Sequence, residues 1–178
     1  AALTSVEFPE SLELIGLDAF EECRLLKIVT FKSKRTKIDR GAFRNCSDLT
    51  SANLPEELET IDKEMFQDCD LLTSFKCPSK VTEVKRQAFY CCTSLLSVEI
   101  PKGCKSVNRW TFQGCRSLVN IALPPNLNNL GEEEFDQEDV ENDVFHDCDK
   151  LLEIIPDHAD LVLALKHRFD DLPAHELC

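Results

Sequence analysis

The sequence predicts a right-handed solenoid of about six stacked turns, each 23 residues long and each carrying one short parallel strand. Two observations lead to this prediction. A set of positions recurs every 23 residues, and a strand-like alternation stands at the same place in every repeat. A fixed period between about 20 and 50 residues is typical of solenoids, because one turn cannot bury its apolar side alone and stacked turns can.

The repeat is defined by a phenylalanine, a cysteine three residues later and a leucine three residues after that. The phenylalanines are Phe20, Phe43, Phe66, Phe89 and Phe112, and the cysteines are Cys23, Cys46, Cys69, Cys92 and Cys115. An apolar residue precedes each phenylalanine by five positions, as Ile15, Ile38, Ile61, Val84 and Val107. Such regularity predicts that these side chains form the shared core.

The segment after each cysteine alternates between apolar and other residues, as in Leu95–Pro101, LLSVEIP. Alternation of period two predicts a short strand with one buried face. A proline ends most of these strands because it cannot donate to a ladder, and Lys32 stands at the one such position without it. Phe20 and Cys23 are spaced i and i+3, so we expect a single helical turn that directs both side chains inward.

These motifs resemble the leucine-rich repeats, and more narrowly the BspA-like (Treponema-type) class. Residues 95–115 carry the resemblance through Leu95, Val98, Ile100-Pro101, Phe112 and Cys115. The resemblance covers about residues 3–156 and implies an α/β leucine-rich-repeat solenoid with parallel strands. It implies little about function, because the motif residues are the core residues.

We expect residues 1–156 to form the solenoid and residues 157–178 to form a helical cap that continues beyond Cys178. Asp157 is a candidate N-cap, and Leu161, Leu165, Phe169 and Leu172 follow at helical spacing. The period breaks before Cys148, which predicts an insertion at about residues 132–143. This stretch, EEEFDQEDVEND, holds eight acidic residues and no basic one. It predicts a solvated acidic loop, with a cation site or a basic partner as the alternatives.

The ten cysteines allow two interpretations. Free cysteine behaves as a small buried apolar residue, so the motif cysteines are expected to be reduced core side chains. Disulfides between neighbouring turns are the alternative, since stacked strands lie about 4.8 Å apart. Cys77 and Cys104 stand at apolar positions of the repeat and are expected in the core, whereas Cys91 is expected to be exposed.

Composition and motifs argue against several functions. A net charge of −13 disfavours nucleic-acid binding, and no apolar run is long enough to span a membrane. The sequence has no metalloprotease, hydrolase or phosphate-loop motif, and cysteines 23 residues apart do not predict a zinc site. We therefore expect no enzymatic activity, no cofactor and no metal.

Two surfaces are candidate partner-binding sites. A basic column, which we call the ridge, consists of Arg40, Lys63, Arg86 and Arg109, with Trp110 beside it as an interface anchor or as a residue packed on a neighbouring loop. The second surface is the concave strand face, which becomes apolar in the late turns at Leu96, Val119, Ala122, Leu152 and Ile155. An exposed apolar patch indicates an interface, unless the C-terminal helix folds over it.

The sequence therefore predicts a non-catalytic protein–protein interaction module, a scaffold or subunit of a larger assembly. The alternatives are a cell-surface adhesin that binds extracellular or host proteins, and a purely structural solenoid without a separable ligand. Reduced thiols favour an intracellular setting and a disulfide ladder favours the cell surface.

Overall fold

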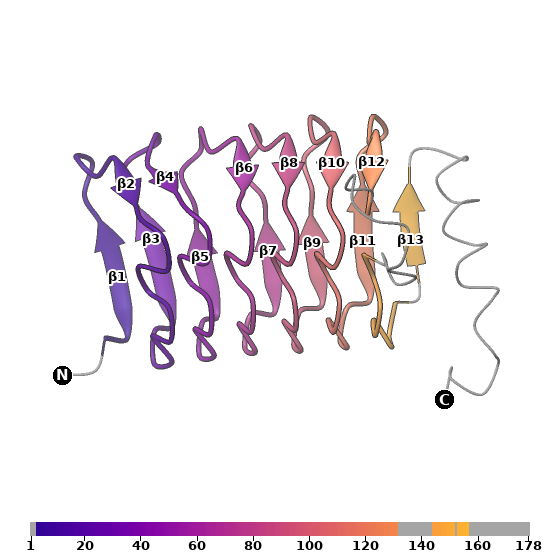
Figure 1. Ribbon diagram of the computed structural model, residues 1–178, viewed down its shortest axis with the longest axis horizontal. Coiled ribbons are helices and arrows are strands. Elements are labelled where there is room, and N and C mark those ends of the chain that lie inside the picture. The colour runs from indigo at the N-terminus through magenta and orange to yellow at the C-terminus, as the bar shows by residue number, and fades with distance from the viewer. Residues whose placement is uncertain (1–2, 132–143, 152, 157–178) are drawn as a thin grey trace.

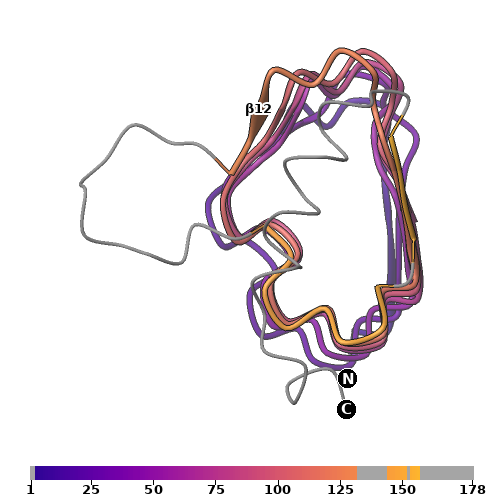
Figure 2. The ribbon, with the colours of Figure 1, turned by 90° about the vertical axis from the view of Figure 1, so that its right-hand side faces the viewer.

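The computed structural model describes residues 3–131, 144–151 and 153–156, with side chains described through residue 151. The predicted cap at 157–178, the insertion at 132–143, and Leu152 lie outside the described residues. Within them the chain coils into stacked turns, and viewed end-on the turns superimpose on one another (Figure 2). This confirms the predicted parallel-strand solenoid.

Each turn contributes one longer and one shorter strand (Figure 1). The longer strands are β1 (Ser5–Phe8), β3 (Ile28–Phe31), β5 (Ser51–Asn53), β7 (Ser74–Lys76), β9 (Ser97–Glu99), β11 (Asn120–Leu123) and β13 (Glu153–Pro156). The shorter strands are β2 (Leu14–Ile15), β4 (Lys37–Ile38), β6 (Thr60–Ile61), β8 (Glu83–Val84), β10 (Ser106–Val107) and β12 (Asn129–Leu130). Every pair is parallel, and almost all pairs join residues 23 apart, such as Val6 with Val29. The β11–β13 register spans the insertion and joins Asn120 to Glu153.

The longer strands form two separate ladders, β1-β3-β5 and β7-β9-β11-β13. The shorter strands divide at the same place, into β2-β4 and β6-β8-β10-β12. We call the junction where β4 faces β6 and β5 faces β7 the seam.

The core is a column of phenylalanine rings that continues through the whole described solenoid. Successive rings from Phe20 to Phe112 stack with centroids 5.5–5.7 Å apart, and Phe145 continues the column at 5.7 Å from Phe112. Phe43, Phe66, Phe89 and Phe112 are fully buried. The late phenylalanine after the insertion therefore occupies the sixth repeat position, as the resumed motif predicts.

The helical turn predicted between each motif phenylalanine and its cysteine is wrong, because the described residues contain no helix. Consecutive backbone N–H groups alternate in direction: that of Glu21 bonds within its own turn, to the Asp18 carbonyl, while those of Phe20 and Glu22 bond to the next turn, at Ala42 and Arg44. A helix directs all its N–H groups along one local axis and could not make these contacts. Left-handed residues at two positions per turn, such as Asp18 and Glu22 with φ of 50° and 58°, produce the alternation.

Truncation of one ring tests the core column. Phe66→Ala should lower the free energy of unfolding by about 3–5 kcal/mol, because it opens a cavity between Phe43 and Phe89. The measurement is chemical denaturation. Leu71→Ala is the control, since Leu71 is 47% exposed and should lose about 0.5 kcal/mol or less. Equal losses for the two variants would contradict the assigned core.

Candidate functional site: the sheet face, the ridge and the thiol column

The strand face presents two outward columns between its buried positions. Ser74, Lys76, Ser97, Glu99 and Asn120 are exposed on it, while Phe75, Val98 and Ile121 point into the core. Most side chains of this face are small or polar, and none of the described ones forms a catalytic group with a neighbour. The face is a broad, shallow surface suited to contact with another macromolecule.

Part of the predicted apolar patch lies within the described residues. Leu96 is 49% exposed just before β9, Ala122 is exposed within β11, and Val119 is half-buried just before β11. Ile155 lies in β13, in register with Ala122. The patch therefore lies entirely on the β7-β9-β11-β13 ladder.

The ridge is not uniform along its length. Arg40 and Lys63 are exposed, and Arg40 pairs with Glu64 at 3.4 Å. Arg86 is half-buried, and Arg109 is buried with 9% exposure. The four residues are stacked by backbone bonds from the preceding turn, for example from the Gly41 N–H to the Lys63 carbonyl. Only the early half of the ridge is thus open to a partner.

Trp110 ends the ridge as a packed, half-buried residue. The guanidinium carbons of Arg86 and Arg109 lie 4.2 Å and 4.7 Å from its ring centroid, within the range of cation–π attraction. Its backbone has φ of 58°, which is unusual for a bulky residue. Of the two interpretations made from the sequence, packing on its neighbours accounts for these contacts.

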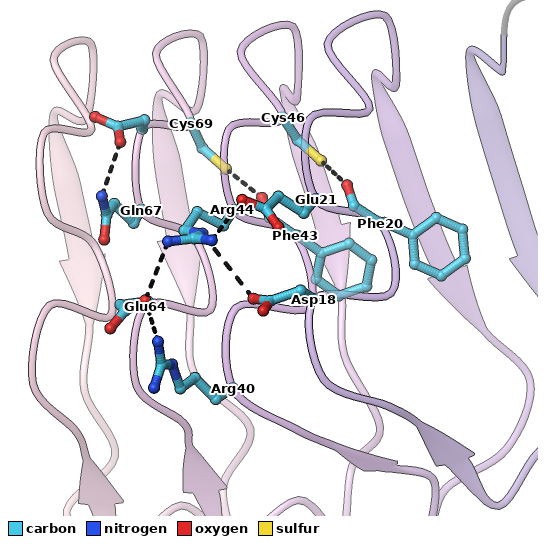
Figure 3. A network of polar contacts seen from close by, with 11 residues as sticks. Asp18, Phe20, Glu21, Arg40, Phe43, Arg44, Cys46, Glu64, Gln67 and Cys69 are labelled. Carbon is cyan, nitrogen blue, oxygen red and sulfur yellow. Dashed lines mark hydrogen bonds and ion pairs between the residues drawn. The ribbon is translucent and has the colours of Figure 1, made fainter.

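A network of charges links three successive turns beside the ridge (Figure 3). Arg44 pairs with Glu21 and lies 4.0 Å from Asp18 in the preceding turn, and it lies 3.5 Å from Glu64 in the following turn. Arg44 and Glu64 side chains are only 26% and 16% exposed. Partial burial strengthens such pairs relative to surface pairs, which are worth about 1 kcal/mol or less. We call Asp18, Glu21, Arg40, Arg44 and Glu64 the Arg44 network; no signal in the sequence repeat pointed to it.

The motif cysteines are free thiols that bond between turns. The Cys46 Sγ donates to the Phe20 carbonyl at 3.2 Å and the Cys69 Sγ to the Phe43 carbonyl at 3.3 Å (Figure 3). The Cys92 Sγ donates to the Phe66 carbonyl at 3.1 Å. The same bond recurs from Cys115 and from Cys148, in the latter case across the insertion. Each cysteine is thus both a core spacer and a link between turns.

Burial also determines the protonation of these thiols. Loss of solvent raises the pKa of Cys46 to about 12, and burial raises that of Cys69 and Cys92 as well. Cys77 and Cys104 are buried as predicted. Cys91 was expected to be exposed and is half-buried, because it packs against Gly114 of the next turn; its pKa is also raised by burial.

The described residues contain no group of three or more histidines, cysteines or carboxylates able to hold a metal ion. In the same part of the chain, no helix has the length and apolar character needed to cross a membrane.

Comparisons with known proteins agree with the geometry. A family model described as BspA type leucine rich repeat region matches residues 1–119 and 82–153, in six copies. None of the curated proteins compared with the chain matches it.

Solved structures of bacterial leucine-rich repeat proteins are similar. A leucine-rich repeat protein of T. pallidum is 28% identical with a TM-score of 0.71, and the match covers 96% of this chain and 71% of that one. A leucine rich cell surface protein of Faecalibacterium prausnitzii is 26% identical with a TM-score of 0.63, over 66% of this chain and 31% of that one. A leucine-rich repeat protein of Bacteroides ovatus, at 18% identity and a TM-score of 0.50, shares the fold.

Thiol labelling tests the cysteine column. At pH 8 the buried motif cysteines should resist iodoacetamide in the folded protein, because the reagent needs a thiolate and burial raises the pKa of these groups. Half-buried Cys91 should be labelled before Cys69 and Cys92, as measured by peptide mass spectrometry. Labelling in denaturant is the control and should reach every cysteine. Rapid labelling of Cys69 in the native protein, or disulfides in the protein from its native source, would contradict the free buried column.

Proposed function

The chain belongs to the BspA-type leucine-rich repeat family, and from this we propose that it is a non-catalytic protein-binding module that engages its partner through the sheet face. The fold is typically that of a binding module. The observation that carries the proposal is the apolar patch of Leu96, Val119 and Ala122, on a sheet face where Ile28 is the other large apolar residue described as exposed within a strand. Such a patch is stabilised when a partner covers it.

The surrounding polar residues give the patch the composition of an interface. Ser97, Glu99 and Asn120 are exposed next to Leu96 and Ala122. Interfaces commonly place an apolar centre inside a polar rim, where rim groups set orientation and the centre supplies most of the binding energy. The partner we propose therefore presents a complementary apolar side chain flanked by hydrogen-bonding groups.

The setting of this binding distinguishes the remaining alternatives. The expectation of an intracellular subunit has no support from the similar proteins, and the Faecalibacterium prausnitzii chain is described as a cell surface protein. We therefore propose an extracellular or cell-surface partner first, and a scaffold inside a larger assembly second. Free thiols are compatible with either setting, since buried cysteines are protected from oxidants by the fold.

Paired variants of similar exposure test the patch. Leu96→Asp should weaken binding of the native partner at least tenfold, because a carboxylate would be desolvated in the apolar centre. The partner is first identified by cross-linking and mass spectrometry from the native source, and its affinity is then measured by calorimetry. Leu71→Asp is the control: Leu71 is 47% exposed against 49% for Leu96, but it lies off the sheet face. Equal affinities for both variants and the native chain would refute binding through the patch.

The open half of the ridge is a second proposed contact, for an acidic segment of the same partner. Lys63→Glu together with Arg86→Glu should weaken binding without unfolding the chain, because the charge of the ridge is reversed. Lys63→Glu alone separates the loss of ridge charge from any loss of packing, since Lys63 is exposed whereas Arg86 packs on Trp110. Affinity that is unchanged in both variants, with the thermal midpoint retained, would remove the ridge from the interface.

A further inference from the structure

The seam differs from every other described junction in its backbone bonds. At other junctions, an N–H bond joins Asp39 to the Ile15 carbonyl, Lys85 to Ile61, and Asn108 to Val84. The equivalent bond from Asp62 to Ile38 is missing. Two further bonds are missing at the seam, from Glu59 to Thr36 and from Thr73 to Thr50, although Thr82 and Leu96 make their equivalents one turn later.

The sequence explains why the seam forms here. Arg35 stands in the apolar column of Leu12, Leu58, Val81, Cys104 and Leu127, and Lys32 replaces the usual proline. The Arg35 side chain is 82% exposed and pairs with Glu57. The next residue, Thr36, is buried instead and donates to the Leu12 carbonyl at 2.6 Å. The turn has thus lost an apolar anchor and shifted its inward residue by one position.

Packing within the sheet changes at the same place. The inward column of Val29, Ala52 and Phe75 has its smallest side chain, the half-buried Ala52, on β5 and its largest on β7. The Phe75 ring contacts the rings of Phe66 and Phe89 at 5.0 Å and 4.9 Å, and both of these lie on its own side of the seam. On the outside, a cleft of about 540 Å³ opens along the seam between Thr36–Asp39 and Glu57–Thr60.

Several contacts still cross the seam. The rings of Phe43 and Phe66 stack at 5.7 Å, and the Cys69 thiol donates to the Phe43 carbonyl. Backbone N–H groups of Glu57 and Leu71 bond to the carbonyls of Lys34 and Ser47, and the turn motif and the charges beside it cross as well. The N–H groups of Gly41, Phe43 and Asn45 bond to the carbonyls of Lys63, Met65 and Gln67. Arg40 and Arg44 both reach across to Glu64, at 3.4 Å and 3.5 Å. The Arg44 Nε and the Asp18 Oδ1 are buried and face each other at 4.0 Å without a hydrogen bond, whereas Arg44 pairs closely with Glu21 in the same preceding turn.

We propose that the seam is a hinge between two rigid ladders, and that the Arg44 network is the latch that holds it closed. The motion is rotation of β1-β3-β5 against β7-β9-β11-β13, which breaks the remaining bonds of the turn motif at Gly41–Asn45. Its use rests on the proposed function: the apolar patch anchors the partner on the second ladder, and the hinge adjusts the polar first ladder to the partner's shape. Hinges of this kind occur where few bonds join two well-bonded bodies.

Amide hydrogen exchange on the free, full chain tests the hinge by comparing bonded amides at equivalent positions. Phe43 and Asn45 bond across the seam, while Phe66 and Asp68 make the same bonds across the next junction, to Ala88 and Tyr90. After correction for intrinsic rates, we expect Phe43 and Asn45 to exchange at least tenfold faster, because opening the hinge breaks their bonds and leaves the ladders intact. Equal protection of the two pairs would overturn the hinge.

Matched variants test the latch and the cause of the seam. Arg44→Met should increase exchange at Phe43 and Asn45 a further tenfold and leave Phe66 and Asp68 unchanged. Lys85→Met is the control, because it removes a similarly buried pair, Lys85–Asp62, at a junction that keeps its backbone bonds. Arg35→Leu restores the apolar anchor and should slow exchange at Phe43.

If Arg44→Met unfolds the chain, protection is lost in β9 and β11 as well. In that case the proposal is decided by Arg35→Leu and by comparing Phe43 and Asn45 with Phe66 and Asp68 in the unaltered chain. No change in seam exchange for either Arg44→Met or Arg35→Leu would overturn the latch. Because these rates are measured without a partner, failure of the hinge leaves the Leu96 binding experiment unaffected, and failure of that experiment leaves the hinge standing.

Discussion

The structure depends on the contact between one turn and the next, repeated every 23 residues. Three interactions recur with this period. They are the alternating backbone N–H bonds, the stack of phenylalanine rings 5.5–5.7 Å apart, and the thiol bond from a motif cysteine to a phenylalanine carbonyl. A single turn has almost no local partner for these groups, so each turn is stable only through its neighbours. The left-handed backbone at two positions per turn, costing roughly 1–2 kcal/mol each for a residue other than glycine, is tolerated because it directs alternate N–H groups to the next turn.

This constraint divides the residues of each repeat between the core and the surface. The phenylalanine, the cysteine, the leucine and the alternate strand positions are occupied by the junction, and are buried in turn after turn. Recognition is left to the outward strand columns and to the turns between strands, where side chains differ from repeat to repeat. The change from mostly polar residues in the early turns, Ile28 excepted, to Leu96, Val119 and Ala122 in the late ones is therefore free of any demand from the fold. For this reason the proposed function rests on the patch and not on the motif.

The repeat made the fold predictable, because its period, strands and core positions depend on which residue types recur. The backbone of the turn motif was not predictable in the same way. Phe20 and Cys23 have helical spacing, but the N–H groups between them are needed by the next turn, and a pattern of side chains does not report that need. The repeat placed Trp110 beside the ridge. It did not show that the ring packs against Arg86 and Arg109, because residue spacing does not report contacts within 5 Å. The Arg44 network was missed because its residues are ordinary surface types, although Arg35 in an apolar column was a readable sign of an irregular turn.

A solenoid with identical junctions would distribute any bending evenly along its length, since every junction would have the same stiffness. One junction with fewer backbone bonds changes this, because strain then collects where the resistance is lowest. The seam places that weak point between the polar strands and the apolar patch, so bending there alters the angle between the two parts of the sheet face without disturbing either. Because salt screens buried charges only weakly, the partly buried pair of Arg44 and Glu64 should make the closed state less sensitive to salt concentration than an exposed pair would. In the proposed hinge, the departure from the repeat at Arg35 therefore sets where the sheet face bends, which is between β5 and β7, next to the surface that we propose binds the partner.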